Sequence, residues 1–321
     1  MRKKVGTTER KSVFLYYVRS VWRSIILPRV IRRWKMQLCL HGWEKRADAE
    51  IIRRRVAYYN RLPAGSVPGS DARCLRKITL KNTHSRYWFD LMRYLRAFSP
   101  DKKISLINGD TWENPTEPTI CKARRLDKKT DNCVLMNLDS LRHFTRVTDF
   151  IPFEEKADIL FFRGEIHGKP HRIRFFEMWA GHPLTDLGDT AKNWESPWPA
   201  TRVSIPDHFR YKYILALEGN DVATALQWIC DSNCIPVMTR PTVESWLMHG
   251  AMQPGVHYIE IKSDFSDVAE KIAWYNSHPN EAKAISEASK EWMRQFQNSR
   301  RENIIAYLVA QRYFENTRQT E

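Results

Sequence analysis

The loop from Arg163 to Arg172 carries side chains that suit the binding of phosphate. It reads RGEIHGKPHR, and its glycines permit a close approach of the backbone to a ligand. Arg163 and Arg172 supply forked guanidinium donors, and Lys169 supplies a compact ammonium group. The pattern therefore predicts a phosphate or diphosphate site, with a solvated loop of routine charges as the alternative.

A second candidate lies in residues 207–238, DHFRYKYILALEGNDVATALQWICDSNCIPVM. Residues 211–217 are rich in β-formers, Gly219, Asn220 and Asp221 are turn-forming, and apolar residues recur at helical spacing from Val222 onward. A turn of this kind places a helix N-terminus, with its free N–H groups and positive dipole end, where a diphosphate can bind. An ordinary strand–turn–helix unit of the core is the alternative.

A carboxylate follows another predicted strand. Asp110 comes after Gly109 at the end of residues 103–108. Open α/β sheets bind ligands beyond the carboxyl ends of their strands, so this position is a candidate for chemistry. By position alone, a turn-forming Asp explains it equally well.

Strands and helices must position these loops, and along the sequence segments with strand-like periodicity alternate with segments with helix-like periodicity. Strands are predicted at residues 103–108, 119–122, 134–138, 157–162, 211–217, 235–238 and 257–261. Helices are predicted at residues 85–97, from 170, from 222, after 242, from 266, at 280–297 and at 302–314. The alternation predicts an α/β protein.

The domain boundaries follow from composition. Residues 61–70 are rich in Pro, Gly and Ser, which marks a linker. We therefore expect a basic helical arm at 1–62, an N-terminal α/β domain at 63–152 and a C-terminal α/β domain at 153–300. A last helix within 301–321 can pack back on the N-terminal domain.

Positive charge is concentrated in the arm. Of the formal net charge of +15, residues 1–62 contribute thirteen, from seventeen Lys or Arg against four Asp or Glu. The apolar run from Val13 to Ile26 is interrupted by Arg19 and Arg23 and is too broken to span a bilayer. Two interpretations remain: a helix lying in the headgroups of an anionic membrane, or a helix packed on the body with a solvated basic face.

Several site classes lack their sequence signals. The six cysteines have no paired CxxC spacing, and no apolar signal peptide precedes them, which favours a reducing cytoplasm. P-loop, GxGxxG, GxSxG, HExxH and DxD patterns do not occur. We expect no metal site and no bound cofactor.

Four segments together resemble glycosyltransferase family 90. In chain order they are FFRGEIHGKPHR, YKYILALEGNDVA, PTVESWLMHGAMQPGVHYIEI and SDVAEKIAWYNSHPNEA. The resemblance covers roughly residues 103–308 and is greatest to bacterial lipopolysaccharide-core members, with more distant similarity to eukaryotic protein O-glucosyltransferases and capsule xylosyltransferases. It implies a GT-B fold, two Rossmann-like domains facing across a cleft. It also implies an inverting, metal-independent transfer, with a nucleotide sugar, commonly a UDP-sugar, in the C-terminal domain and the acceptor on the N-terminal one.

The resemblance also assigns residues. Asp110 matches the catalytic base of the glucosyltransferases, although Thr111 and Trp112 stand where those have Tyr-Pro. The predicted nucleotide-sugar-binding set is Arg163, Gly164, Lys169, Arg172, Tyr211, Lys212, Gly219, Asn220, Asp221 and Glu244. The eukaryotic members carry an Arg soon after the turn glycine, and this chain has none between Gly219 and Arg240.

We therefore predict an inverting hexosyltransferase that acts on a lipid-linked lipopolysaccharide or lipooligosaccharide core acceptor. The arm would hold the enzyme peripherally on the cytoplasmic face of an anionic membrane. Two other classes stay open, namely a basic nucleic-acid-binding protein and a non-catalytic membrane-binding adaptor with a decayed transferase fold. Pocket shape, which periodicity does not report, decides the sugar, the acceptor hydroxyl and the linkage.

Overall fold

The computed structural model describes residues 5–9, 12–111, 113–129, 131–138, 140–143, 145–192 and 194–319. The chain divides into two compact units. Unit 1 comprises residues 1–10, 143–241 and 251–295, and unit 2 comprises residues 11–142, 242–250 and 296–321. Both units combine helices with sheets that contain parallel strands, so the predicted α/β class is confirmed.

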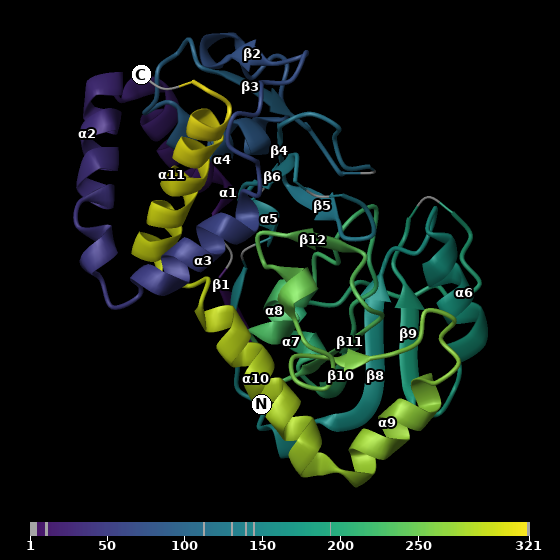
Figure 1. The fold of residues 1–321 in the computed structure, drawn as a ribbon. Helices are drawn as coiled ribbons and strands as arrows, with labels where there is room; N and C mark the ends of the chain where they lie inside the picture. The colour runs from purple at the N-terminus through teal and green to yellow at the C-terminus, as the bar shows by residue number, and fades with distance from the viewer. Residues whose placement is uncertain are drawn as a thin grey trace. The chain divides into compact units, whose positions relative to one another are not determined.

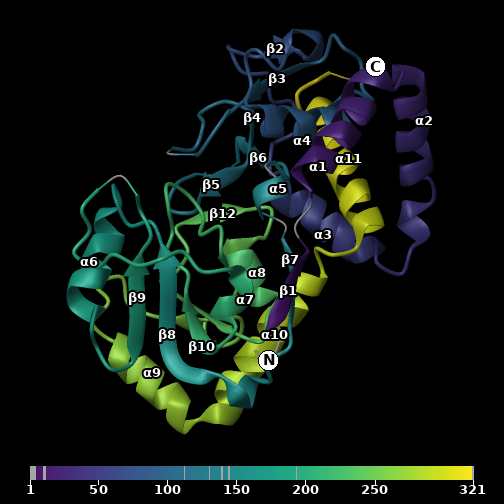
Figure 2. The same ribbon diagram turned by 180° about the vertical axis from the view of Figure 1, so that it is seen from behind.

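Unit 1 is built on a five-stranded parallel sheet in the order β13-β11-β10-β8-β9 (Figure 1). Its strands are β8 (Ala157–Gly164), β9 (Thr185–Asp189), β10 (Tyr211–Leu215), β11 (Ile235–Met238) and β13 (Ile259–Glu260). Its helices are the 3-10 turn η4 (Phe153–Glu155), α6 (Pro170–Trp179), α7 (Ile205–His208), α8 (Leu226–Cys230), α9 (Val268–Ser277) and α10 (Pro279–Arg294). A separate antiparallel pair joins β1 (Gly6–Glu9) and β7 (Arg146–Asp149), as Figure 2 shows.

The sheet of unit 1 forms because its strands are apolar on both faces. Leu160, Leu215 and Val237 lie on three different strands and are buried in one cluster. Parallel strands covered by helices need such near-continuous apolar side chains. Pro170 opens α6 at its first turn, as predicted, because its missing N–H is not needed there. Phe176 of that helix is buried in the same cluster and packs the helix against the sheet.

Unit 2 holds a four-stranded sheet in the order β2-β3-β4-β6, in which only the β2–β3 pair is antiparallel. A second, two-stranded antiparallel sheet joins β5 to β12. The strands are β2 (Arg73–Cys74), β3 (Lys103–Leu106), β4 (Thr119–Cys121), β5 (Ala123–Arg125), β6 (Cys133–Leu135) and β12 (Val243–Ser245). The helices after the N-terminal segment are η3 (Leu75–Lys77), α4 (Ser85–Leu95), α5 (Ser140–His143), η5 (His249–Ala251) and α11 (Ser299–Asn316), of which α5 and η5 each run one residue past the unit's limits.

The N-terminal segment is helical and packs within unit 2. It consists of α1 (Val13–Val21), the π-helical η1 (Trp22–Ile26), α2 (Arg29–Leu40), η2 (Trp43–Lys45) and α3 (Ala49–Tyr59). α1 contacts α4, while α2 and α3 contact α11, and both ribbon views place α1, α2 and α11 together (Figures 1 and 2). The fully buried Arg55 of α3 pairs with Glu302 of α11, Nη2 to Oε2 at 2.9 Å. Packing on the body, one of the two interpretations, therefore holds for α3.

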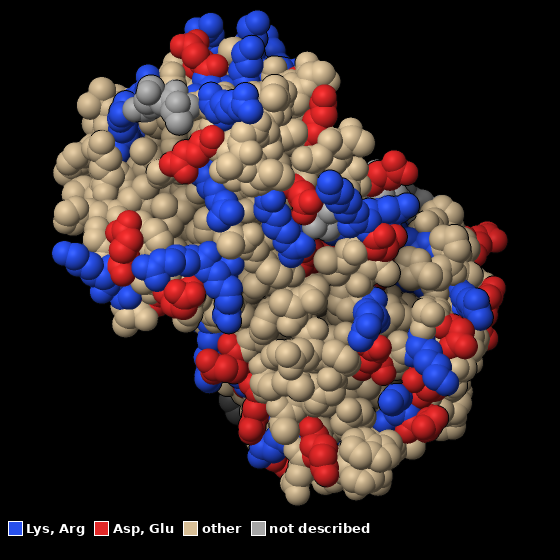
Figure 3. Space-filling model, in the orientation of Figure 1, with Lys and Arg blue, Asp and Glu red and all other residues tan. Residues whose placement is uncertain are grey.

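The outer helices of this segment leave many apolar side chains in solvent. Eleven of the eighteen large apolar side chains that are exposed among the described residues lie between Val13 and Leu38. Figure 3 shows mostly uncharged surface along the outer side of α2. None of the helices among the described residues combines the length and the apolar content that crossing a bilayer requires.

The two units differ from the predicted domains: residues 1–10 and 143–152 belong to unit 1, and residues 11–62 belong to unit 2. Residues 242–250 belong to unit 2 because β12 pairs with β5, and the helix predicted after Thr242 is therefore wrong. Residues 296–300 also belong to unit 2, because α11 begins at Ser299 and packs on α2, α3 and α4. The helix predicted from Val222 begins only at Leu226.

Candidate functional site

The sheet of unit 1 has a topological switch point between β8 and β10. From β8 the chain passes through α6 to β9 on one side, whereas from β10 it passes through α8 to β11 on the other side. The loops that leave the carboxyl ends of β8 and β10 therefore diverge. Open α/β sheets bind ligands at such a switch point, and the region between these two loops is called the crevice below.

Arg172 ties these two loops together. Its Nε donates to the carbonyl of Glu218 at 2.9 Å and its Nη2 to the carbonyl of Leu217 at 2.6 Å. Its Nη1 donates to the carbonyl of Glu165, after β8, at 2.8 Å. One guanidinium thus joins the loop after β8 to the turn after β10, whose two carbonyl groups lie 45 and 46 positions beyond Arg172 in the chain.

The loop of residues 165–169 and the turn at Gly219 meet around this side chain. A Cβ at Gly219 would lie 3.6 Å from Nη2 of Arg172 and 3.8 Å from Cε of Lys169. His171 bonds the Glu218 carbonyl through Nε2 at 2.8 Å. Gly168 has a φ of 69°, a left-handed conformation that glycine adopts without strain, and it turns the chain into α6.

The electrostatics at this point favour an anion. Arg172 makes no ion pair among the described residues, because all three of its bonds go to neutral carbonyls. Burial lowers the pKa of its guanidinium to about 10, which still leaves it protonated at neutral pH. α6 begins at Pro170 with no side-chain cap, so its first N–H groups and dipole add to the same positive field. The arrangement can bind a diphosphate.

A residue that the sequence prediction missed organises the crevice. Asp189, at the end of β9, is buried, and its Oδ1 accepts from the backbone N–H groups of Ile166 at 3.3 Å and Ala191 at 3.0 Å. Its Oδ2 accepts from Nε1 of Trp194 at 2.6 Å. Although burial alone raises the pKa of this carboxyl, these hydrogen bonds lower it overall. The sequence pattern predicts no strand at β9, because the polar DLGD run is typical of a loop, and it therefore does not identify this carboxylate.

Arg163 does not lie open to the crevice. Its Nη2 pairs with Oδ1 of Asp186 at 2.6 Å, its Nη1 donates to the Asp186 carbonyl at 3.0 Å, and the guanidinium lies over the Phe161 ring. Tyr211 bonds the other carboxylate oxygen of Asp186 at 3.1 Å. Gly164 is required at the end of β8, because a Cβ there would lie 2.8 Å from the Phe162 ring. Arg163 therefore lies against the sheet, with its charge already paired.

The remaining predicted residues of unit 1 divide between the two ends of β10. Tyr211 and Lys212 begin the strand, at the end opposite Gly219, and Nζ of Lys212 pairs with Asp158 at 2.5 Å. The structure does not bring these two to the crevice. Asn220 and Asp221 follow Gly219 directly, with Asn220 exposed and Asp221 buried.

Asp110 belongs to unit 2 and follows β3, as predicted. Its Oδ1 accepts from Nζ of Lys122, which follows the neighbouring strand β4, at 2.8 Å. The Lys122 side chain is nearly buried, whereas the Asp110 side chain is partly exposed. The carboxyl ends of two parallel strands thus present an oriented carboxylate to solvent.

Glu244 also belongs to unit 2, where it is fully buried on β12. Its Oε1 accepts from Nε of Arg124 at 2.7 Å, and its Oε2 accepts from the Tyr58 hydroxyl and from the Gly250 N–H at 3.3 Å. Both oxygens are engaged inside the unit, and this network holds β12 against β5 and α3. Because both carboxylate oxygens of Glu244 already have partners, the structure does not support its predicted role in nucleotide-sugar binding.

Metal ligands do not gather in the described part of the chain, where no three His, Cys, Asp or Glu side chains form a group that could hold an ion.

Comparison with known proteins identifies the class. The family model described as Glycosyl transferase family 90 matches residues 137–313. The chain is 39% identical over 275 residues to "O-glucosyltransferase LpsA" of Dichelobacter nodosus, which covers 84% of this chain and 86% of that protein. It is 35% identical over 92 residues to "Protein O-glucosyltransferase 2" of Danio rerio, and 26% identical over 167 residues to "Protein O-glucosyltransferase 3" of Homo sapiens. Those matches cover 29% and 50% of this chain, and 18% and 32% of the respective relatives.

The chain therefore belongs to glycosyl transferase family 90. The resemblance inferred from the four sequence segments is confirmed, including the distant similarity to protein O-glucosyltransferases. The chain is a glycosyltransferase similar along most of its length to an LpsA-type O-glucosyltransferase.

Proposed function

We propose that this enzyme transfers a hexose from a nucleotide sugar, in the first instance a UDP-sugar, to a lipopolysaccharide or lipooligosaccharide core acceptor. The binding of the nucleotide-sugar donor is inferred from the cluster of Arg172 and Lys169 at the switch point. Arg172 has no ion pair within the described residues. The names of the relatives support glucose as the sugar.

The proposed architecture is GT-B, with the donor held by unit 1 and the acceptor by unit 2. Arg172, Lys169 and the N-terminus of α6 bind the diphosphate and stabilise the charge that develops on the leaving nucleoside diphosphate. In other transferases a metal ion performs that task, and we propose that here these cations perform it alone. Arg163 does not bind the donor in this proposal, and its ion pair with Asp186 stabilises the neighbouring strands β8 and β9.

The proposed reaction is a single inverting displacement. The acceptor oxygen attacks the anomeric carbon from the face opposite the diphosphate, and its proton passes to the carboxylate of Asp110. The bond from the anomeric carbon to the diphosphate oxygen breaks, and its electron pair leaves with the nucleotide. Lys122 positions the carboxylate through its 2.8 Å contact.

The proposed location is the inner face of the cytoplasmic membrane, with α1 and α2 lying against anionic lipid. Two observations support it. These helices expose most of the large apolar side chains found in solvent, and no Asp or Glu occurs from Lys11 to Trp43. Nucleic acid is not a proposed partner, because the same basic segment exposes apolar rather than only charged surface.

A thermal-shift screen against nucleotide sugars tests the donor assignment. A ligand at about 100 times its dissociation constant should stabilise the protein by roughly 2.7 kcal/mol, so the true donor should stand out. Chelator should leave both this shift and the transfer rate unchanged. If no nucleotide sugar raises the melting temperature, a non-catalytic adaptor becomes the better description.

A further inference from the structure

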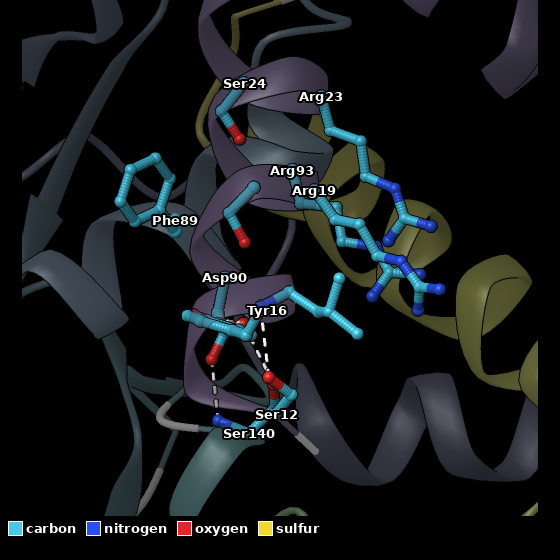
Figure 4. Close-up of a pocket in the computed structure, with 11 residues that line it drawn as sticks. Ser12, Tyr16, Arg19, Arg23, Ser24, Phe89, Asp90, Arg93 and Ser140 are labelled. Atoms are coloured by element: carbon cyan, nitrogen blue, oxygen red, sulfur yellow. Dashed lines mark hydrogen bonds between the residues drawn. The ribbon is translucent and has the colours of Figure 1, made fainter.

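Two adjacent cavities in unit 2 share a wall made of Arg23 and Arg93. One has a volume of about 190 Å³ and lies between α1 and α4. The other, of about 240 Å³, is bounded by η1, α2, α4 and α11. Figure 4 shows the guanidinium groups of Arg19, Arg23 and Arg93 gathered on one side of the first cavity. Like charges that lie close together disfavour one another's charged form, and an anion placed among them would offset this.

The second cavity is the more cationic of the two. Its lining residues are Arg23, Leu27, Arg32, Lys35, Cys39, Arg93, Asn303 and Tyr307. Four of these eight are Arg or Lys, and none is Asp or Glu. In the first cavity the one carboxylate, Asp90, is already bonded to the Tyr16 hydroxyl at 3.0 Å and to the N–H and hydroxyl of Ser140 at 2.6 and 2.9 Å.

Buried donors along these cavities lack partners. Arg32 is nine-tenths buried, and its Nε has no hydrogen-bond partner among the described residues. The hydroxyl of Ser24, a fully buried residue that lines the first cavity, likewise has none. A buried donor left unsatisfied is unfavourable, so the Nε of Arg32 points to a ligand in the second cavity that would accept from it.

The pKa values of two arginines of the second cavity are lowered, whereas Tyr94 raises the pKa of Arg93. Desolvation, followed by the neighbouring Arg93, lowers the pKa of Arg23 below its ordinary value. Desolvation and Arg96 lower the pKa of Arg32 in the same direction. Neither guanidinium forms an ion pair in the described part of the chain, so an anion between them would relieve both effects.

We propose that the cavity of Arg23, Arg32, Lys35 and Arg93 binds a phosphate group of a membrane lipid. Guanidinium forks match phosphate oxygens, and Lys35, which also lines the cavity, is exposed. The source is a lipid because Trp22, Ile26 and Trp34, exposed by 54%, 56% and 57%, lie on the same helices as the cations. Apolar side chains at the depth of the acyl boundary place neighbouring cations at the level of the headgroup phosphates. The inference rests on the membrane partner proposed above and supplies its specific contact.

The test compares two double variants of equal charge. Arg23→Gln/Lys35→Gln removes two exposed cations from the cavity, and Arg29→Gln/Arg54→Gln removes two exposed cations outside it. Both pairs should keep the parental circular dichroism and melting temperature. Binding is measured to phosphatidylcholine vesicles doped with phosphatidic acid, and separately to inorganic phosphate at constant ionic strength.

We expect the cavity pair to lose about tenfold more vesicle affinity than the control pair, because only the cavity pair removes charge-assisted hydrogen bonds to phosphate. Equal losses of vesicle affinity in the two pairs, with no difference between them in binding of inorganic phosphate, would show that only overall charge matters and would overturn the site. If inorganic phosphate binds through Arg23 and Lys35 while the vesicles do not distinguish the pairs, the lipid source is wrong. Nucleotide-sugar binding at Arg172 is read in the same samples and should be unchanged in both, so a failure of the donor assignment would be visible separately.

Discussion

Arg172 keeps its charge where burial opposes it. With the pKa of its guanidinium lowered to about 10, it remains a cation at neutral pH but has lost much of its hydration. A diphosphate would replace that hydration with ionised oxygens, whereas the carbonyls of Leu217 and Glu218 supply only dipoles. Arg163, by contrast, already has the carboxylate of Asp186. Two arginines of the same loop therefore have different roles.

The first prediction compares these two arginines. Arg172→Gln should weaken binding of the nucleoside diphosphate by at least about tenfold, because it removes a charged donor from the anion site. Arg163→Gln should change nucleotide affinity less and lower the melting temperature more, because it leaves Asp186 unpaired against the sheet. Calorimetric titration with the nucleotide and thermal melts measure both quantities. Equal losses of nucleotide affinity in the two variants would show that Arg163 also binds the diphosphate.

The second prediction concerns Asp110 as the base. Asp110→Asn keeps the size of the side chain and removes its basicity, so turnover should fall by roughly 10² to 10⁴ while nucleotide-sugar binding persists. Asp101→Asn is the matched control, since Asp101 is an exposed carboxylate of the same unit that pairs with Arg76. Near-parental transfer by Asp110→Asn would mean that Asp110 only forms the turn.

At the scale of elements, β12 is a strand where the sequence pattern predicts a helix. Val243 to Ser245 pair with β5, and His249 follows in the 3-10 turn with its Nδ1 accepting from the N–H of Ser245 at 3.2 Å. Burial lowers the pKa of His249 to about 4. Its Nε2 is buried and has no hydrogen-bond partner among the described residues, so protonation of the ring would be poorly accommodated.

The third prediction is an acid sensitivity located in this segment. The unfolded chain takes up a proton near pH 6.5 and folded His249 only near pH 4, so stability falls as the pH drops between these values and is unaffected above about 7. The loss should approach about 3 kcal/mol near pH 4. His249→Asn keeps an acceptor for Ser245 and does not titrate. Urea unfolding across this pH range should therefore be less pH-dependent in the variant by that amount, and parallel curves would contradict the assignment.

Local sequence patterns predicted those elements that local forces determine. The strand before Asp110 and the strand that carries Arg163 follow from apolar periodicity, and the start of α6 follows from Pro170. Glu244 was misplaced because its strand depends on β5, more than a hundred residues away, and such pairing leaves no local signal. The partners of Arg163 and Arg172 are likewise set by strand order. That Tyr211 and the Gly219 turn lie at opposite ends of β10, however, could have been predicted from the length of the strand alone.

At the scale of the whole molecule, charge and exposed apolar surface coincide. The seventeen Lys and Arg of residues 1–62 occur in the same segment as eleven exposed apolar side chains. Each basic residue near an anionic surface contributes about 1 kcal/mol, and each inserted aromatic side chain adds a term that salt does not screen. Membrane binding should therefore have a salt-dependent and a salt-resistant part.

The fourth prediction separates these parts. Trp34→Ser should weaken binding to anionic vesicles by roughly tenfold, and high salt should not restore or remove this difference. Trp274→Ser, in α9 of unit 1 and similarly exposed at 45% against 57%, is the control and should bind as the parent does. Vesicle co-sedimentation at low and high ionic strength measures both variants. If the two tryptophans behave alike, α2 does not insert into lipid.

The pairing of Arg55 with Glu302 has a consequence for biosynthesis. The two residues are 247 positions apart, and each end of the bond lies in a different chain segment of unit 2. On the ribosome, α3 therefore leaves the exit tunnel long before its partner helix α11 has been made. A buried cation without its carboxylate is strongly unfavourable, so α3 cannot adopt its final packing during most of translation. Unit 2 must therefore wait for residues 296–321 before it can complete its packing.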